Sequence, residues 1–159
     1  MQIVFLPIYL TLTLIIILWP IMQQMAASLS KRLPARFFRS STGFFSCHQW
    51  EKGGSFYQRV FRIRKWKHLL PDGGAMVGGY AKKHLTDYSR QNLEKFIEES
   101  CRAEFSHWVA MLPFWVFGFF AEFAIIYFML AYAIVINLPC ILAQRFNRPR
   151  IQKVLERLP

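Results

Sequence analysis

Cysteine is scarce in this sequence, and two common signatures of soluble enzymes are missing. Cys47, Cys101 and Cys140 are the three cysteines, and no two of them form a C-x-x-C pair. Neither a disulfide framework nor a cysteine-rich zinc site is therefore indicated. The sequence also has no G-x-S-x-G nucleophile elbow and no P-loop, so it lacks the marks of an α/β-hydrolase and of a P-loop nucleotide enzyme.

Charge is missing from two long stretches of the chain. Met1 to Ser30 has no charged side chain, and Trp108 to Gln144 has only Glu122. A disordered chain would be poor in aromatic residues, whereas Phe alone occurs 16 times here. An ordinary soluble domain is excluded because the apolar residues, 54% of the chain, are clustered. We therefore predict an all-α integral membrane protein, with residues 1–159 as a single membrane domain.

The first apolar run, residues 3–22, predicts a transmembrane helix. Its twenty residues suffice to cross the roughly 30 Å hydrocarbon layer of a bilayer. A secretory signal peptide is the competing interpretation. The run lacks a positively charged beginning and is longer than the usual apolar region of a signal peptide, so we favour a retained anchor.

The second apolar run, residues 108–144, is too long for one crossing and barely long enough for two. Pro113, Gly118 and Pro139 interrupt it. A short or re-entrant helix to about Gly118, followed by a full span from about Phe123, fits these lengths best. The sequence thus predicts an apolar hairpin here, although two full crossings remain an alternative.

Basic residues outnumber acidic ones by 20 to 9 and flank the apolar runs. The region between the runs, residues 23–107, has a net charge of +8, and the tail after Gln144 has +4. The positive-inside rule places both on the cytoplasmic side of the cell membrane, in a multi-pass protein. Nucleic acid is not expected as a partner, because no zinc-finger spacing or RNP-type motif is present.

Two further segments have helical character. The region 31–107 is predicted to lie at the membrane surface, with a helix over about 90–108 whose buried face carries an apolar stripe. The stripe comprises Leu93, Phe96, Ile97, Cys101 and Trp108. Residues 147–159 predict a basic amphipathic helix on the membrane surface, with Pro149 near its first position.

His107 is the leading candidate for a general base. It follows Glu104 by three residues, and both project onto the apolar side of the predicted helix, where an ionisable pair is costly unless partnered. A carboxylate one turn away can orient an imidazole. His68, which precedes Asp72, and His84 are the reserve candidates. A metal site of the Glu-x-x-His kind needs two such helices, so no metal is predicted.

Substrate binding is predicted at a basic cluster and at the glycine turn that follows it. Four cations surround Trp66, namely Arg62, Arg64, Lys65 and Lys67. They suit either an electrostatic membrane patch or a site for a phosphate-bearing donor. Gly73 could present a backbone N–H group to an oxyanion or a phosphate. A simple turn is the alternative for the glycine.

Several blocks resemble the glycosyl-diaponeurosporenoate acyltransferase family, which performs the last step of staphyloxanthin-type carotenoid synthesis. They are Arg64-Lys65-Trp66-Lys67-His68 with Asp72-Gly73, Arg102-Ala103-Glu104 with His107-Trp108, Asn137 with Pro139, and Gln144-Arg145 with Asn147-Arg148-Pro149-Arg150. His84 also falls where the family has a histidine. From these blocks we add Arg102, Arg145 and Arg148 to the substrate-binding candidates.

The resemblance implies transfer of a fatty acyl group onto a sugar hydroxyl of a glycosylated carotenoid, or of a related glycolipid. The implied partners are the lipid bilayer, an acyl donor (acyl-CoA or acyl carrier protein) and the glycolipid acceptor, and no cofactor is expected. Such a transfer needs a base and stabilisation of an oxyanion. The alternative is a non-catalytic membrane accessory protein that binds lipid or a partner enzyme through its basic face.

Overall fold

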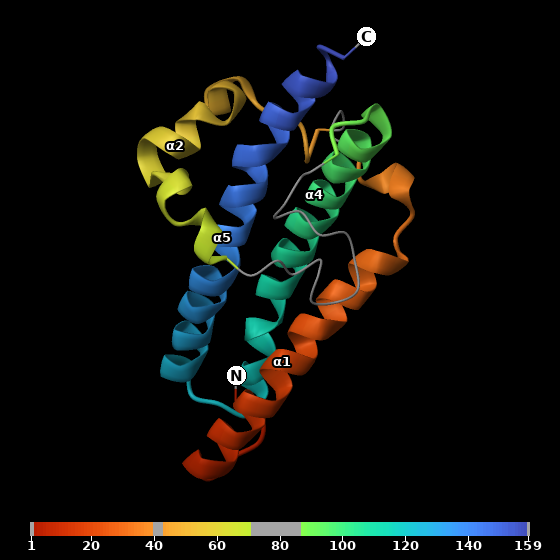
Figure 1. Ribbon diagram of the computed structural model, residues 1–159. Coiled ribbons are helices and arrows are strands. Elements are labelled where there is room, and N and C mark those ends of the chain that lie inside the picture. The colour runs from red at the N-terminus through yellow and green to blue at the C-terminus, as the bar shows by residue number, and fades with distance from the viewer. Residues whose placement is uncertain (1, 40–42, 71–86, 159) are drawn as a thin grey trace. The chain divides into compact units, whose positions relative to one another are not determined.

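The chain begins with a long apolar helix, α1, over Ile8–Arg32. The computed structural model describes residues 2–39, 43–70 and 87–158, and within these ranges all regular secondary structure is helical (Figure 1). The other α-helices are α2 (Ser55–Phe61), α4 (Arg90–Met111) and α5 (Phe123–Leu155). Short 3-10 helices lie between them: η1 (Ala35–Phe37), η2 (Gln49–Gly54), η3 (Ile63–Lys65), η4 (Lys67–Leu69) and η5 (Leu112–Phe119). The predicted all-α class is confirmed for the described residues.

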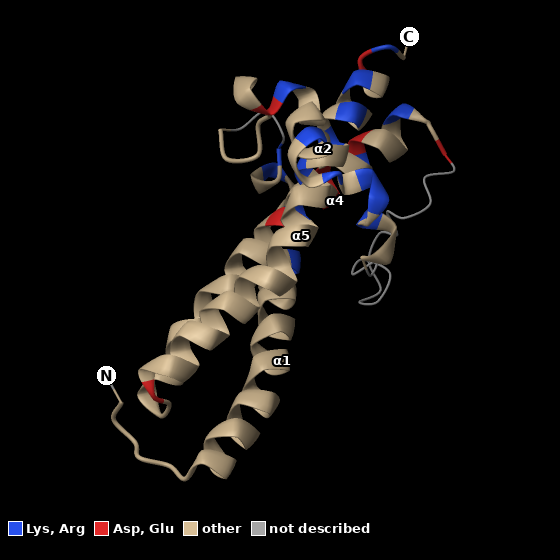
Figure 2. Cartoon of the chain, turned by 90° about the vertical axis from the view of Figure 1, so that its left-hand side faces the viewer, with Lys and Arg blue, Asp and Glu red and all other residues tan. Residues whose placement is uncertain are grey.

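The chain divides into two compact units. The apolar unit comprises Met1–Arg32 and Phe105–Leu138, and the basic unit comprises Leu33–Glu104 and Pro139–Pro159. Of the 20 Lys and Arg residues, only Lys31 and Arg32 fall in the apolar unit. The ribbon of the apolar unit is accordingly almost entirely tan in Figure 2. Both α4 and α5 contribute residues to each unit.

Helix α1 starts later and ends later than the predicted span over residues 3–22. Pro7 directly precedes it, and the carbonyl of Pro7 accepts the backbone N–H of Thr11 at 3.1 Å. A proline fits this position because its nitrogen has no hydrogen to leave unsatisfied. Pro20 lies inside the helix without ending it. The predicted apolar N-terminal helix is confirmed, with shifted bounds.

Aromatic and small side chains form the core of the apolar unit. Trp19 of α1 packs against Phe117 of η5, with ring centroids 6.2 Å apart, and against Tyr132 of α5 at 5.4 Å. Ala133 and Met129 complete this cluster on the α5 side. Small residues let the backbones approach closely, as is usual between helices in lipid.

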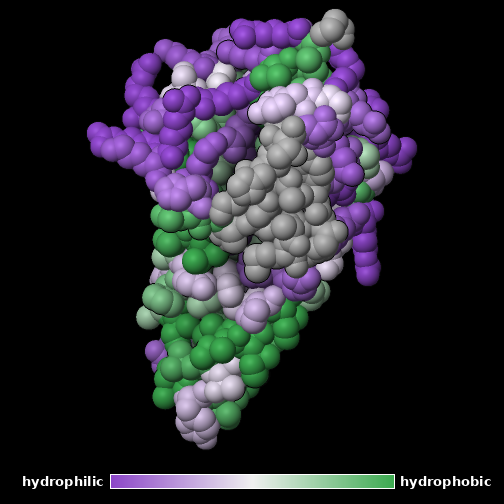
Figure 3. Space-filling view, in the orientation of Figure 1, coloured by the Kyte–Doolittle hydropathy of each residue, from purple (hydrophilic) through white to green (hydrophobic). Residues whose placement is uncertain are grey.

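Most of the apolar side chains of this unit nevertheless point outward. Ile16 of α1 is 73% exposed and Phe128 of α5 is 67% exposed. The surface in the region of α1 is accordingly mostly green, that is hydrophobic, in Figure 3. In the apolar 18-residue stretch of α1 only 17% is buried, and in the corresponding stretch of α5 only 22% is buried. In water so much exposed apolar area is unfavourable, whereas in a bilayer it is the expected surface. Both helices are long and apolar enough to cross a membrane.

The apolar run over residues 108–144 contains a break close to the predicted one. Helix α4 ends at Met111, η5 carries the chain to Phe119, and α5 begins at Phe123. The backbone N–H of Ile3 donates to the carbonyl of Phe119 at 2.8 Å, so the first residues of the chain cover a group that η5 leaves unpaired. The start of α5 at Phe123 agrees with the predicted start of the full span.

The predicted tail helix over residues 147–159 is helical as far as Leu155, but it does not begin near Pro149. Helix α5 continues through Pro139 and Pro149 to Leu155. A proline inside a helix removes one backbone hydrogen bond and costs about 3 kcal/mol. Here Phe146 (0% exposed) and Arg148 (3% exposed) are buried in the turn before Pro149, and this packing favours continuation of the helix.

The amphipathic pattern of the helix over about 90–108 is largely confirmed by α4. Leu93 and Cys101 are fully buried, and Phe96 and Ile97 are nearly so. Trp108, which the pattern placed on the buried stripe, is instead 38% exposed. The stripe was derived for a helix with one buried face, whereas Trp108 belongs to the apolar unit, where large side chains face outward.

Helix α2 is held close to α5 inside the basic unit. Gly54, which precedes α2, has φ +85°, and a Cβ there would lie 2.8 Å from the carbonyl oxygen of Phe146. Only glycine combines this backbone conformation with so short an approach. Tyr57 of α2 and Ile63 of η3 form a buried cluster with Phe146, so the segment after α2 is fixed against α5.

Candidate active site

His107 pairs with a buried amide in the apolar unit. Its Nδ1 lies 2.9 Å from Oδ1 of Asn137, which projects from α5 and is 1% exposed. The side-chain nitrogen of Asn137 donates to the carbonyl of Ala133 at 3.0 Å. Because a carbonyl can only accept, this bond assigns the amide nitrogen and turns Oδ1 toward the histidine.

That assignment fixes the tautomer of neutral His107. An amide oxygen accepts, so Nδ1 carries the proton and Nε2 has the basic lone pair. An imidazole whose second nitrogen is held by a third group is the usual arrangement of a catalytic histidine. Histidine, aspartate and glutamate are general bases in enzymes, and the geometry gives His107 the form that this chemistry requires.

Glu104 is fully buried in the basic unit, as its projection onto the apolar side predicted. One carboxylate oxygen accepts from Nε of Arg145 at 2.6 Å, and the other makes a short contact with a terminal nitrogen of Arg148. The prediction that this buried carboxylate needs a partner is therefore confirmed, and the partners are two arginines. The further prediction that Glu104 orients His107 stays a prediction.

Glu51 completes the ion cluster, which we define as Glu51, Glu104, Arg145 and Arg148. Arg145 also donates to Glu51 at 2.6 Å, and Arg148 donates to the carbonyl of Phe45 at 2.8 Å. The two positive and two negative charges balance, and no buried side-chain polar atom of the described residues lacks a partner. The charges of the cluster are therefore compensated within it, and loss of one member would leave a buried charge without its partner.

Burial and the neighbouring Glu51 carboxylate also raise the pKa of the Tyr57 phenol. Tyr57 belongs to α2 and is 3% exposed. A phenol in this environment stays protonated and can donate a hydrogen bond. Tyr57 is therefore not poised to accept a proton from substrate.

Lys67 and Arg150 lie against the same aromatic ring of the basic unit. The Lys67 Nζ is 5.2 Å from the centroid of the Phe146 ring, and the guanidinium carbon of Arg150 is 3.6 Å from it. Nζ of Lys67 also donates to Oδ1 of Asn147 at 2.9 Å. Burial, and then the nearby Arg150 and Arg64, lower the pKa of Lys67.

The other predicted residues divide into three groups. Lys65 and His68 are exposed, and Trp66 is half-buried with its indole N–H donating to the carbonyl of Phe61 at 2.8 Å. Arg102 is paired with Glu98 at 2.7 Å and with Glu99 at 3.2 Å. Three predicted residues lie outside the described ones: His84, Asp72 and Gly73. Contact of any of these residues with substrate stays a prediction.

Sequence reasoning did not assign a role to three residues that the structure brings into these sites. Asn137 could have been recognised from the sequence, because an amide within an apolar span is costly and is usually functional or paired. Arg150 lies among other basic residues in the sequence, and no motif sets it apart from them. Glu51 is 94 positions from its partner Arg145, and no local pattern reveals such a pair.

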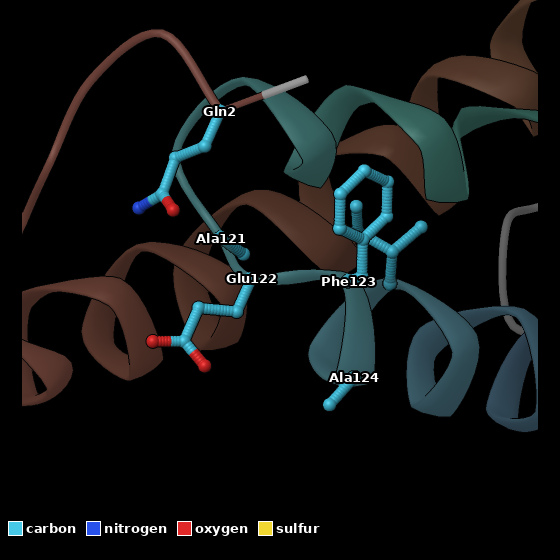
Figure 4. A pocket seen from close by; sticks show the side chains of 6 residues that line it. Gln2, Ala121, Glu122, Phe123 and Ala124 are labelled. Atoms are coloured by element: carbon cyan, nitrogen blue, oxygen red, sulfur yellow. The ribbon is translucent and has the colours of Figure 1, made fainter.

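A hollow of about 340 Å³ lies elsewhere in the apolar unit, beside the turn between η5 and α5. Figure 4 shows the Glu122 carboxylate and the Gln2 amide among its lining side chains, with Phe123 at one side. The amide of Gln2 donates to the carbonyl of Phe120 at 3.4 Å. Among the described residues that line this hollow, Glu122 is ionisable and none is a histidine.

Comparison with known proteins identifies the family. Residues 34–157 match the family described as glycosyl-4,4'-diaponeurosporenoate acyltransferase. The proteins of that name from Staphylococcus aureus strains N315 and USA300 are each 36% identical over 138 residues, which is 86% of this chain and 83% of theirs. No solved structure is significantly similar to the chain. The chain therefore belongs to the glycosyl-4,4'-diaponeurosporenoate acyltransferase family and is an acyltransferase, as the resemblance predicted.

Proposed function

We propose that this protein transfers a fatty acyl group to a sugar hydroxyl of a glycosylated carotenoid, with His107 as the general base. The observation that carries the proposal is the bond between Nδ1 of His107 and Oδ1 of Asn137. It holds the imidazole in the tautomer whose Nε2 can accept a proton. The relatives from Staphylococcus aureus are named for an acyl transfer involving glycosyl-4,4'-diaponeurosporenoate.

The proposed step is the attack of the sugar hydroxyl on an activated acyl carbonyl. Nε2 of His107 takes the hydroxyl proton as the new C–O ester bond forms. A tetrahedral oxyanion results, and its collapse breaks the bond to the donor's leaving group. With a thioester donor the leaving group is a thiolate, which takes the proton back from the imidazolium. Atoms and charge balance without a cofactor.

The surroundings of His107 suit an acceptor that has a lipid-like tail. In the sequence His107 directly precedes the apolar run over residues 108–144, and its own unit exposes large apolar side chains. A carotenoid tail can occupy the hydrocarbon layer beside such a surface while its sugar remains near the polar boundary. We infer a multi-pass protein of the cell membrane whose basic regions face the cytoplasm.

The alternative of a non-catalytic accessory protein rests on the basic face alone. An electrostatic patch would bind an anionic surface without any need for a paired imidazole. The family is named for an enzyme, and His107 has the partner that a base requires. These two observations favour catalysis.

The test is acyl transfer by purified protein in nanodiscs. Wild type, His107→Ala and His48→Ala are incubated with glycosyl-4,4'-diaponeurosporenoate and a labelled donor, either acyl-CoA or acyl-loaded acyl carrier protein. The ester is detected by mass spectrometry. Loss of the base is expected to lower kcat roughly 10²–10⁴-fold. His48→Ala is the matched control because His48 is exposed in the basic unit.

Two results would count against the proposal. If folded His107→Ala turned over at nearly the wild-type rate, His107 would not be the base, and His68 and His84 would become the next candidates. If wild type formed no ester with either acyl-CoA or acyl carrier protein as donor, the accessory role would be favoured. Gel filtration of each variant confirms that it is folded.

A further inference from the structure

Three cations of the basic unit, Arg64, Lys67 and Arg150, have no acidic partner among the described residues. Lys67 and Arg150 both lie against Phe146, and Arg64 is close enough to lower the pKa of each. No ion pair within 4.0 Å joins any of these three cations to an acidic side chain of the described residues. The neighbours of the three therefore leave a local excess of positive charge.

Two of these three cations are partly buried, which makes their excess of positive charge unusual. Lys67 and Arg150 are half-buried, and among the described residues the Lys67 ammonium donates its hydrogen bond to the neutral amide of Asn147. Removing an ammonium from water without a counter-charge is unfavourable. Solvated surface lysines avoid this cost by extending into water. A site that keeps a partly buried ammonium without a negative partner is suited to binding an anion, which would supply the negative charge.

The backbone that carries Arg64 and Lys67 is held in a fixed conformation. Arg62 has φ 50°, a left-handed conformation that is rare for a residue with a side chain. The side-chain oxygen of Gln58 accepts the backbone N–H of Arg64 at 3.1 Å, and Ile63 is fully buried. Backbone strain of this kind is often found at binding sites. Arg64 and Lys67 are thus presented by a preorganised segment, and Arg150 by helix α5.

We propose that Arg64, Lys67 and Arg150 form a binding site for a phosphate group. Arginine and lysine are the usual ligands of phosphate, and charge-assisted hydrogen bonds make such contacts strong. The phosphate belongs either to the nucleotide part of an acyl-CoA donor or to the headgroup of an anionic lipid. The first source rests on the proposed acyl transfer, whereas phosphate binding itself does not.

The experiment measures binding separately from acyl transfer. Wild-type protein is placed in phosphatidylcholine nanodiscs, and its thermal unfolding is followed with and without coenzyme A. A second arm replaces part of the lipid with phosphatidylglycerol and omits coenzyme A. A phosphate ligand that binds only the folded state is expected to raise Tm. The arm that shows the increase identifies the source of the phosphate.

Three variants test whether the named cations are responsible. Lys67→Met and Arg150→Met are expected to lose the ligand-dependent increase in Tm and to weaken binding about 10-fold or more. Lys153→Met is the matched control: Lys153 is exposed in the same helix, α5, and its replacement is expected to leave the increase unchanged. If the Lys67→Met or the Arg150→Met protein fails to fold, Arg64→Met replaces it in the test, because Arg64 is exposed.

Without ligand, Lys67→Met is expected to be more stable than wild type near neutral pH. The pKa of Lys67 is lowered in the folded protein, so in the range between this value and 10.5 the unfolded state binds more protons. Wild-type stability therefore gains with rising pH in that range, and the advantage of Lys67→Met shrinks as pH approaches 10.5. A merely structural lysine would show the opposite, a loss of stability on replacement.

The results separate this proposal from the proposed function. Equal ligand effects in wild type and Lys67→Met, or no effect in either arm, would overturn the phosphate site. A shift that depends on Lys67, together with no acyl transfer from any donor, would leave the phosphate site standing and refute the proposed function. His107→Ala should still bind coenzyme A or phosphatidylglycerol as wild type does.

Discussion

At His107, a single amide decides which ring nitrogen carries the proton. Asn137 cannot rotate its amide without losing the bond from its nitrogen to the Ala133 carbonyl. The orientation of the imidazole therefore depends on α5, although the histidine itself belongs to α4. A general base must be both correctly protonated and correctly aimed, and the proposed role of Asn137 is to supply both conditions.

Replacing Asn137 tests this positioning role. Asn137→Ala is expected to lower kcat roughly 10–100-fold with little change in KM, because acceptor binding does not require the amide. Asn137→Asp keeps an acceptor for Nδ1 and is expected to recover part of the loss. A rise in KM at unchanged kcat would contradict the positioning role, as would failure of the aspartate variant to do better than alanine.

Replacing Glu104 is expected to affect stability, in contrast to replacing Asn137, because the Glu104 carboxylate pairs with two buried guanidinium groups. Glu104→Gln leaves Arg145 and Arg148 with Glu51 as the one remaining carboxylate of the ion cluster. Removing one member of a buried ion pair typically costs about 3–5 kcal/mol. Chemical denaturation in detergent should show a loss of this size. If Glu104 only oriented His107, activity would fall while the free energy of unfolding stayed the same.

At the scale of elements, the sequence predicted what local periodicity determines. The helix over about 90–108 followed from apolar side chains spaced along one face, and α4 buries Leu93, Phe96 and Cys101 as that spacing required. The start of α5 near Phe123 followed from the length of the apolar run and the interruption at Gly118. Such features depend on neighbouring residues alone.

What the sequence could not reveal depends on contacts between distant residues. Pro149 suggested a helix start, because proline favours the first position of a helix, yet buried Phe146 and Arg148 keep α5 continuous there. The pairing of Arg145 with Glu51 has no local signature. In the same way, His107 was recognisable as a candidate base, but its partner lies 30 positions away.

The approach of α2 to α5 gives a prediction for a whole element. Gly54→Ala would place a Cβ 2.8 Å from the Phe146 carbonyl and force a left-handed backbone onto alanine, so it is expected to cost about 1–3 kcal/mol. Gly43→Ala is the matched control, since nothing lies within 4 Å of its added Cβ. Equal stability of the two variants in thermal unfolding would show that α2 can move away from α5.

At the scale of the whole molecule, charge and helix length together predict the orientation in the membrane. A helix of 33 residues such as α5 is about 50 Å long, which exceeds the roughly 30 Å hydrocarbon layer. Glu122 directly precedes this helix, and Arg157 follows it by two residues. If α5 spans the bilayer, these two residues lie on opposite sides. The positive charge of the basic unit favours the cytoplasm for Arg157.

Cysteine labelling tests this orientation. In a background without the three native cysteines, single cysteines replace Glu122, Arg157 and Arg59, and a membrane-impermeant maleimide is applied to intact cells. Glu122→Cys is expected to react from outside. Arg157→Cys and the exposed Arg59→Cys should react only after permeabilisation, because both belong to the basic unit and the positive-inside rule assigns that unit one side. Reaction of Arg59→Cys and Arg157→Cys from opposite sides would refute this topology, since it would require the basic unit to be divided by the membrane.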